Sequence, residues 1–269
     1  MRRAPATAKI NLALVVGPRR PDGKHEVATV LQRIDLADRI SLEPAPRLEV
    51  RGFAEDTLVR DALVALSGAA EVDPRWAIRI DKRIPVAAGL GGGSSDAATA
   101  LRLANETLPE PLPRKRLRAL GARIGADVPF FLTQGPQLGD GDGSELAPLD
   151  LPQDYWVVLL LPTGARKPST AAVYEAFDGV AGFEQRQGAL RGALDETRRP
   201  SDLAALPPND LAASPLADEL RELGAFRADV TGAGPVVYGL FIRREPAEGA
   251  CRALASRGRT WLTVPTWYG

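Results

Sequence analysis

The glycine-rich stretch at residues 81–105 constrains the structure of this chain more than any other segment. An alternating apolar run at residues 76–80 precedes it and predicts a strand, and four glycines follow at positions 89, 91, 92 and 93. Ser94-Ser95-Asp96 then predicts the start of a helix rich in Ala and Leu. Glycine allows tight turns and close approach to a ligand, and a helix N-terminus offers free N–H groups to an anion. The stretch therefore predicts a phosphate cradle.

Three well-known phosphate-binding patterns do not fit this stretch. A Walker loop requires Gly-x-x-x-x-Gly-Lys-Ser/Thr, and no lysine lies between Lys82 and Lys115. The dinucleotide fingerprint would start at Gly89 and require a sixth-position glycine, where Ser94 stands. The protein-kinase strings His-Arg-Asp and Asp-Phe-Gly do not occur. A purely structural turn is disfavoured, because four glycines cost much backbone entropy.

The composition is that of an ordinary globular protein. The chain has 269 residues, enough for one large domain or two of common size, and a composition shift at residues 148–152 predicts a boundary. Lys plus Arg and Asp plus Glu both number 34, so no broad basic field indicates a nucleic-acid partner. The single cysteine, Cys251, excludes an internal disulfide and a Cys-rich metal site.

The N-terminus superficially resembles a signal peptide, since Met1-Arg2-Arg3 is followed by an apolar run. Lys9 and Asn11 interrupt that run, and no small-x-small cleavage site follows it. No apolar stretch approaches the roughly 20 residues that a membrane span requires. The sequence predicts a cytoplasmic protein with no membrane partner.

Four polar residues are candidates for a site. Lys9 and Asn11 share one face of a predicted strand and point either into a site or into solvent. His25, the only histidine, follows a strongly punctuated turn and is either a surface group or a functional one. Asp127 lies between a glycine turn and the apolar run Val-Pro-Phe-Phe-Leu, so it is either a helix cap or a partly desolvated base.

The acidic segment at residues 139–145 suggests a calcium loop at first sight. An EF-hand starting at Asp140 would require glycine at 145 and glutamate at 151, but these positions hold Glu and Leu. The segment is therefore interpreted as a hairpin or loop.

Several segments, taken in order, resemble the GHMP kinase family, which includes galactokinase, homoserine kinase and mevalonate kinase. The main one is Lys-Arg-Ile-Pro-x-x-Ala-Gly-Leu-Gly-Gly-Gly-Ser-Ser-Asp-Ala-Ala, which is similar to the family's ATP loop. The other similar segments are residues 8–12, 20–25, 125–132, 169–174, 209–211 and 231–234. The triple glycine before Ser-Ser-Asp favours the branch of the family whose acceptor carries a cytidine diphosphate group.

The resemblance implies a two-domain α+β fold. Residues 1–150 would form an ATP-binding domain like ribosomal protein S5 domain 2, and residues 151–269 a ferredoxin-like domain. ATP with Mg²⁺ and a small-molecule acceptor would meet in the cleft between them. The oligomeric state would be a monomer or a homodimer.

The resemblance also implies roles for individual residues. Asp127 would accept or orient the acceptor hydroxyl, and Lys9 would neutralise charge beside it. Ser94 or Ser95 would lie near Mg²⁺. The acceptor would contact Asn11, His25, Thr170 and Tyr174. The ATP phosphates would be wrapped by Pro85, Val86, Ala87, Ala88, Gly89, Leu90, Gly91, Gly92, Gly93, Ser94 and Ser95.

Two positions depart from the family pattern. Lys24 stands where the family usually has a tyrosine that stacks on cytosine, and stacking is worth about 1–3 kcal/mol per base. Either Tyr174 takes over that contact, or Lys24 pairs with the substrate diphosphate. At Asp56-Thr57-Leu58 the family usually has an Asn-Leu pair near adenine, and Thr57 has less hydrogen-bonding capacity.

Three alternatives to such a kinase follow from the same residues. One is a GHMP kinase for another acceptor, of the homoserine or mevalonate type. The second is a non-catalytic nucleotide-binding protein on the same scaffold, which the presence of both Lys9 and Asp127 disfavours. The third is RNA binding by the first half, which the zero net charge disfavours.

Overall fold

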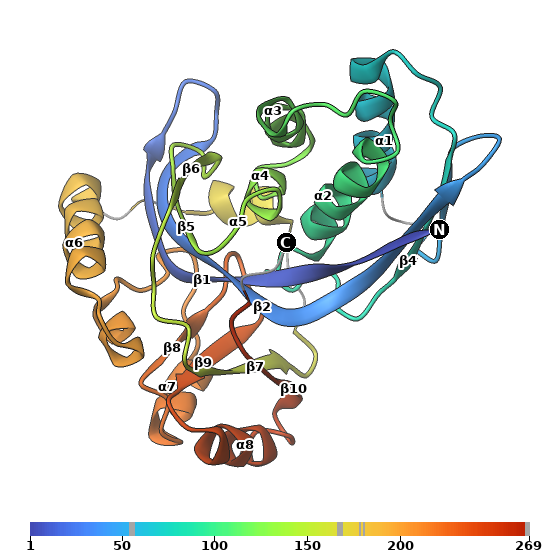
Figure 1. The fold of residues 1–269 in the computed structure, drawn as a ribbon. Helices are drawn as coiled ribbons and strands as arrows, with labels where there is room; N and C mark the ends of the chain where they lie inside the picture. The colour runs from blue at the N-terminus through green and yellow to red at the C-terminus, as the bar shows by residue number, and fades with distance from the viewer. Residues whose placement is uncertain (54–56, 166–168, 178, 180, 267–269) are drawn as a thin grey trace.

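The computed structural model describes residues 1–53, 57–165, 169–177, 179 and 181–266, which form two β-sheets with flanking helices (Figure 1). The first sheet has the strand order β3-β4-β2-β5-β6, with β1 paired to β2. The second has the order β10-β7-β9-β8. The strands of the first sheet are β1 (Arg2–Arg19), β2 (His25–Pro44), β3 (Glu49–Arg51), β4 (Trp76–Asp81), β5 (Gln137–Asp140) and β6 (Glu145–Pro148). Those of the second are β7 (Trp156–Pro162), β8 (Arg227–Val230), β9 (Val237–Phe241) and β10 (Gly258–Thr263).

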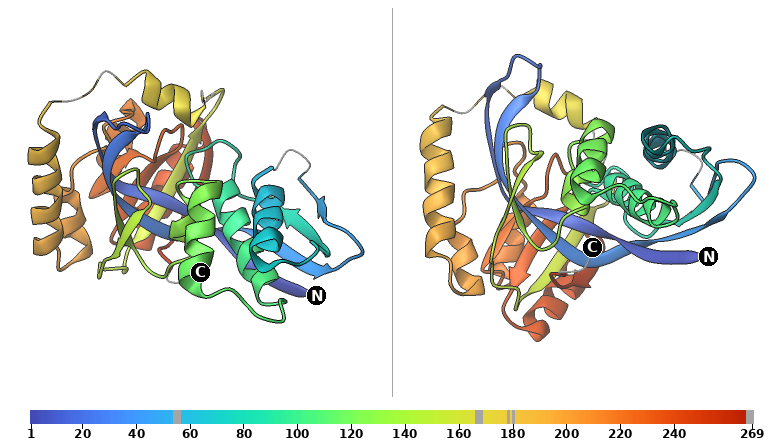
Figure 2. Two further views of the ribbon diagram at one scale, coloured as in Figure 1. Left: turned by 90° about the horizontal axis from the view of Figure 1, so that it is seen from above. Right: turned by 45° about the horizontal axis from the view of Figure 1, so that its top comes forward.

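A long antiparallel hairpin of β1 and β2 runs across the whole molecule (Figures 1 and 2). The apolar runs at residues 27–34 and 39–42 predicted two separate strands, but the structure joins them into one. The register of the pairing shifts at residues 35 and 36, after which Thr7 lies opposite Ala37 and Ala6 opposite Asp38. The buried Asp38 carboxylate accepts hydrogen bonds from Lys82 Nζ (2.6 Å) and the Ile84 N–H (2.8 Å), so its burial is compensated.

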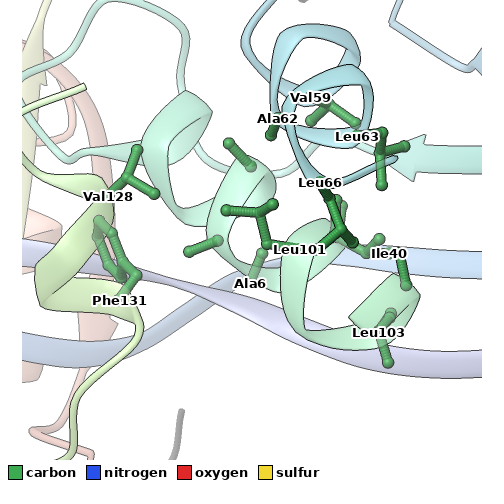
Figure 3. Packing of buried hydrophobic residues seen from close by; sticks show 14 of the residues in the cluster. Ala6, Ile40, Val59, Ala62, Leu63, Leu66, Leu101, Leu103, Val128 and Phe131 are labelled. Carbon is green, nitrogen blue, oxygen red and sulfur yellow. The ribbon is translucent and has the colours of Figure 1, made fainter. Parts of the chain in front are cut away.

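Helices α1 (Thr57–Ala70), α2 (Gly92–Asn105), α3 (Arg114–Ile124) and α4 (Val128–Phe131) pack on the first sheet. Figure 3 shows Leu66 of α1 pointing toward Leu101 of α2 and Ile40 of β2, and Leu63 belongs to the same buried cluster. All four side chains are at most 1% exposed. This core anchors the helix that follows the glycine loop.

Helix α2 starts earlier than the sequence predicted. The expected cap was Ser94-Ser95-Asp96, whereas the N-cap is Gly91, in the left-handed region with φ of 70° and no side-chain cap bond. Glycine adopts this conformation without steric cost, so the glycine run itself enters the first turn of the helix.

The second sheet carries helices on one face and joins the hairpin with the other. The elements here are α5 (Thr170–Glu175), α6 (Phe183–Glu196), the 3₁₀ helix η1 (Pro200–Ala205), α7 (Pro215–Glu222) and α8 (Arg244–Ala253). Helices α7 and α8 pack against one face of the sheet. On the other face, Val157 and Tyr238 share a buried cluster with Ile10 and Leu12 of β1. One continuous core therefore links the two sheets.

The predicted boundary at residues 150/151 lies between β6 and β7, and it stays a prediction. None of the helices formed by the described residues has the length and apolar character needed to cross a membrane.

Candidate active site

A pocket of about 760 Å³ lies where the two sheets meet, and its volume is typical of small-molecule sites. It receives side chains from β1, the glycine segment, the start of α4, helix α5 and the turn at residues 232–233. All residues that the sequence predicted for the site line this pocket except Ser95. Ser95 is 1% exposed within the first turn of α2. The chain thus brings together residues up to 224 positions apart, from Lys9 to Ala233.

The glycine segment is held against a second glycine turn. Gly89 has φ of +81°, and a Cβ placed on it would lie 2.4 Å from the Thr231 carbonyl oxygen. The Val236 N–H donates to the Ala88 carbonyl (3.3 Å), and the Lys9 N–H donates to the Leu90 carbonyl (3.0 Å). The cradle is therefore fixed on both sides, by β1 and by the second half of the chain.

Lys9 and Asp127 face each other across the pocket. Lys9 Nζ lies 3.7 Å from Asp127 Oδ2, with side-chain exposures of 5% and 39%. Lys9 Nζ also donates to Asn11 Oδ1 (2.6 Å), and Asn11 Nδ2 donates to Thr29 Oγ1 (2.8 Å), which fixes the ammonium group. Asp127 is the N-cap of α4, yet its side chain makes no cap hydrogen bond. The carboxylate is thus turned toward Lys9 and the pocket, and the solvent interpretation of Lys9 is wrong.

His25 presents a buried acceptor in an aromatic corner. Its Nδ1 lies 2.9 Å from the Gly17 carbonyl oxygen, which can only accept, so Nδ1 carries the proton. Its Nε2 is buried and has no hydrogen-bond partner within the described part of the chain. The rings of Tyr174 and Phe177 have centroids 5.8 and 5.7 Å from the His25 ring. This corner suits a planar ligand that carries an N–H donor.

The tyrosine hydroxyl in this corner stays protonated at neutral pH. Burial, and to a lesser extent the nearby Asp127 carboxylate, raise the pKa of Tyr174. Tyr174 therefore offers a neutral donor beside the carboxylate.

Lys82 is a pocket residue that sequence reasoning missed. Its ammonium group donates to Asp38 Oδ2 (2.6 Å) and Asp96 Oδ2 (2.8 Å), and a Cβ on Gly92 would lie 3.3 Å from its Nζ. Burial alone would lower the pKa of Lys82, but the two carboxylates raise it. The sequence feature that could have identified Lys82 was its position at the end of a strand, directly before the glycine run. Lys82 keeps a positive charge beside the cradle.

Lys24 and Asp142 form the second feature that the sequence did not indicate. The Lys24 side chain, in the β1–β2 turn, pairs with Asp142 in the β5–β6 hairpin, and both line the pocket. The Ser144 hydroxyl (2.6 Å) and N–H (3.2 Å) donate to the other Asp142 oxygen. The predicted hairpin at residues 139–145 is confirmed, and it forms part of the pocket wall. The described residues contain no group of three or more His, Cys, Asp or Glu placed to hold a metal.

The Lys24–Asp142 pair predicts a pH-dependent contribution to stability. Burial alone would raise the pKa of Asp142, but hydrogen bonds from Lys24 and Ser144 lower it to about 2. The unfolded value is about 4, so the ionised carboxylate stabilises the fold above pH ~4, and this contribution is lost as the pH falls toward 2. After allowance for solvent screening it is on the order of 1 kcal/mol.

Asp142→Asn is therefore expected to lower the free energy of unfolding in urea at pH 7, with the gap to wild type closing between pH ~4 and ~2. Asp218→Asn is the matched control, because Asp218 also forms an ion pair, with Arg221, but its side chain is 73% exposed. A gap that stays constant down to pH 2.5 would contradict the assignment.

The adenine contacts predicted near Asp56 and Thr57 lie outside the part of the chain that the structure describes. Asp56 lies outside the described residues, and so does the side chain of Thr57.

Comparison with known proteins agrees with this geometry. The family models "GHMP kinases N terminal domain" and "GHMP kinases C terminal" match residues 57–135 and 191–260. The chain therefore belongs to the GHMP kinase family, as its motifs predicted, and a kinase of this family uses ATP. Within the family, a 4-diphosphocytidyl-2-C-methyl-D-erythritol kinase of Geobacter sulfurreducens is 38% identical, over 96% of both chains. The enzyme of the same name from Gloeobacter violaceus is 37% identical, over 94% of this chain and 90% of its own.

Solved structures agree with both the fold and the branch. A crystal structure of 4-(cytidine 5'-diphospho)-2C-methyl-D-erythritol kinase superposes with a TM-score of 0.80 at 33% identity, over 98% of this chain and 99% of that one. The mevalonate kinase of Methanococcus jannaschii has a TM-score of 0.75 at 14% identity, over 98% of both chains, and shows the fold alone. The predicted two-domain GHMP kinase fold is confirmed.

Proposed function

We propose that this protein transfers the γ-phosphoryl group of ATP to the 2-hydroxyl of 4-diphosphocytidyl-2-C-methyl-D-erythritol, in isoprenoid precursor synthesis. The relatives over nearly the full chain carry that name. The observation that carries the proposal is the Lys9–Asp127 pair (3.7 Å), which faces the glycine cradle inside one pocket. That pairing supports a site in which a carboxylate meets the acceptor hydroxyl and a cation meets the bound triphosphate.

The reaction needs an in-line transfer with little covalent help from the protein. The acceptor oxygen forms a bond to the γ-phosphorus, the bond from that phosphorus to the β–γ bridging oxygen breaks, and ADP leaves with the electron pair. The hydroxyl proton passes to Asp127, or Asp127 orients the hydroxyl. Lys9 stabilises the charge on the transferring group.

The triphosphate would lie along residues 85–94 and the N-terminal turn of α2. Helix N-termini and close glycine backbone suit phosphate groups, and Lys82 adds a cation beside Gly92. Mg²⁺ takes one or two protein oxygens plus phosphates and water, and the pocket-lining Ser94 and Asp127 can supply them. When bound, the ion neutralises charge on the phosphates. The buried Ser95 side chain does not fit this role.

The cytosine end would lie in the His25 corner. The unpartnered Nε2 accepts from the exocyclic amino group of cytosine, and the Tyr174 and Phe177 rings provide the apolar surround. Thr170 and Asn11 line the same pocket. A uracil ring has a carbonyl at the position of that amino group and would face the acceptor unfavourably.

The decisive test is a coupled ADP-release assay with purified protein, ATP and Mg²⁺. Three acceptors are compared at equal concentration: 4-diphosphocytidyl-2-C-methyl-D-erythritol, homoserine and mevalonate. We expect turnover of the first alone, and loss of turnover when EDTA removes Mg²⁺. Turnover of homoserine or mevalonate without the first would establish the alternative GHMP activity, and tight nucleotide binding with no turnover of any acceptor would establish the non-catalytic alternative.

Replacement of Lys24 by tyrosine tests how the cytosine end is built. The Lys24–Asp142 pair supports a pocket in which this ion pair takes the place of the family's tyrosine, rather than a pocket that has simply lost the tyrosine ring. Lys24→Tyr leaves the Asp142 carboxylate without its cation, so we expect a threefold to tenfold weaker Kd for CDP by calorimetry, with ATP affinity unchanged. Arg19→Tyr, at another pocket-lining cation nearby, is the control. Tighter CDP binding by Lys24→Tyr would show instead that an aromatic platform is missing.

We also propose a cytoplasmic protein that works as a monomer or a homodimer without nucleic-acid or membrane partners. The absence of a broad charged field and of disulfide-forming cysteine pairs supports this setting. Light scattering of the purified protein measures the oligomeric state directly.

A further inference from the structure

The proposed base stands at the start of a helix too short to hold itself in place. Helix α4 has four residues, Val128–Phe131, and Asp127 is its N-cap without a side-chain cap bond. Isolated helices shorter than about 12 residues are marginal even in favourable sequences. The position of Asp127 must therefore be set by contacts from outside α4.

Arg33 of β2 supplies such contacts at the other end of the helix. Its Nη2 donates to the Phe130 carbonyl (2.7 Å) and to the Thr133 carbonyl (2.8 Å). Its guanidinium carbon lies 5.1 Å from the centroid of the Phe130 ring and 5.6 Å from that of Phe131. The last carbonyls of a helix lack partners within it, and a cation there suits the helix dipole. Arg33 thus binds the C-terminal end of α4 through hydrogen bonds to its carbonyls and through contacts with the two phenylalanine rings.

The same hairpin holds both ends of α4. Arg33 is the direct cross-strand partner of Lys9, and directly opposite residues of an antiparallel pair share a face. Lys9 faces Asp127 at the start of α4, and Arg33 faces the carbonyls at its end. Two cations at one register position of β1 and β2 therefore lie at the two ends of a single helical turn, and Arg33 holds the end that is remote from the pocket.

Arg33 is itself held in place by burial and by backbone hydrogen bonds. Its side chain is among the largest fully buried ones, at 1% exposure. The Thr266 N–H donates to its carbonyl (3.1 Å), and the Asp35 N–H donates to the Val264 carbonyl (2.9 Å), so the last described residues of the chain pair with β2 here. Burial and, to a lesser extent, Arg102 lower the pKa of Arg33 to about 10, which leaves it charged at neutral pH.

We propose that Arg33 is a positioning residue for phosphoryl transfer: it acts through α4 to hold the Asp127 carboxylate at the acceptor hydroxyl. This inference rests on the proposed role of Asp127. Displacement of a reacting group by about 1 Å can cost about a hundredfold in rate. Other elements contact the substrate and the nucleotide. Loss of the Arg33 contacts is therefore expected to lower kcat and to leave KM unchanged.

The test is a double-mutant cycle with Arg33→Met and Asp127→Asn, measured as kcat with ATP and the diphosphocytidyl acceptor. Arg33→Met alone is expected to lower kcat tenfold to a hundredfold, with both KM values within threefold of wild type. In the Asp127→Asn background the same change is expected to cost less than twofold, because the group it positions has been removed. Arg33→Lys keeps the charge and one carbonyl contact, and is expected to recover part of the loss.

Arg227→Met is the matched control for loss of stability alone. Arg227 is also a buried arginine that donates to carbonyls, those of Leu206 (2.6 Å) and Pro207 (2.8 Å), but these lie outside the pocket lining. We expect a lower Tm with kcat within threefold of wild type.

An Arg33→Met loss that is equal in both backgrounds, or that appears in KM, would overturn the inference. So would a kcat loss no larger than that of Arg227→Met at the same decrease in Tm. If the wild-type protein does not phosphorylate the diphosphocytidyl acceptor, the proposed function fails. The cycle then still tests the positioning role with the acceptor that is turned over, or with ATP hydrolysis.

Discussion

Replacement of Asp127 by asparagine is expected to lower kcat by roughly 10²–10⁴-fold, the range for loss of a general base. The amide has nearly the same shape but cannot take up the acceptor proton. Asp127 is 39% exposed toward the pocket and forms no cap bond, so α4 loses little when the carboxylate is removed. We expect the ATP Kd from fluorescence titration to stay within about threefold of wild type and the Tm to change little.

Two comparisons make this result specific. Asp218→Asn removes an exposed carboxylate far along the chain and is expected to keep full activity. A pre-steady-state burst separates the chemical step from product release, and the loss is expected in the burst rate. Near-normal turnover of Asp127→Asn would contradict the role as a base, because the amide oxygen can still orient the hydroxyl but cannot take up its proton.

The parts of the site that could be predicted from sequence are those coded by short local patterns. The glycine run predicted a backbone cradle, because glycine adopts the left-handed φ values seen at Gly89 and Gly91 without steric cost. The alternation of Lys9 and Asn11 with buried Ile10 placed both polar side chains on one face of a strand. The structure places Asp127 at the N-cap position of α4 without a side-chain cap bond, which favours the role as a base, and that role stays a prediction.

The parts that could not be predicted depend on pairing between distant residues. Lys24 and Asp142 are 118 positions apart, and Arg33 and Phe130 are 97 apart. No spacing or periodicity connects such residues. They meet because β5 pairs with β2 and because α4 packs against the sheet. Ser95 was misplaced for a different reason, since the helix starts within the glycine run and turns that side chain into the core.

The fold shows the same division between local and long-range information. Apolar runs predicted strand segments within β2, but four intervening residues, 35–38, suggested a break. In the structure the register shifts at residues 35 and 36, and the strand continues beyond them, with the buried Asp38 carboxylate bound to Lys82. A strand segment that contains a charged residue is read as a loop from sequence when the partner that compensates the buried charge lies 44 positions away.

Lys9→Met is expected to have the second large effect, a loss of roughly 10²–10³-fold in kcat, which is the range for removal of one preorganised electrostatic donor. The ammonium group lies between the two glycine turns: a Cβ on Gly91 would lie 3.0 Å from Lys9 Cγ, and one on Gly232 would lie 3.3 Å from Lys9 Nζ. It therefore stands beside both the expected phosphates and the Asp127 carboxylate. Methionine keeps most of the apolar stem and removes the charge.

The same change is expected to leave Tm unchanged or raise it slightly, which separates catalysis from folding. The desolvation cost of a 5%-exposed lysine is only partly offset by its 3.7 Å ion pair and its 2.6 Å hydrogen bond to Asn11 Oδ1. Activity and stability should therefore move in opposite directions, as at sites where charge is kept for function. The Lys9→Met/Asp127→Asn double variant should lose far less than the product of the two single losses, because both residues act on one transferring group. A fully multiplicative loss, or a Lys9→Met enzyme within threefold of wild-type kcat, would show that the two residues do not work as a pair.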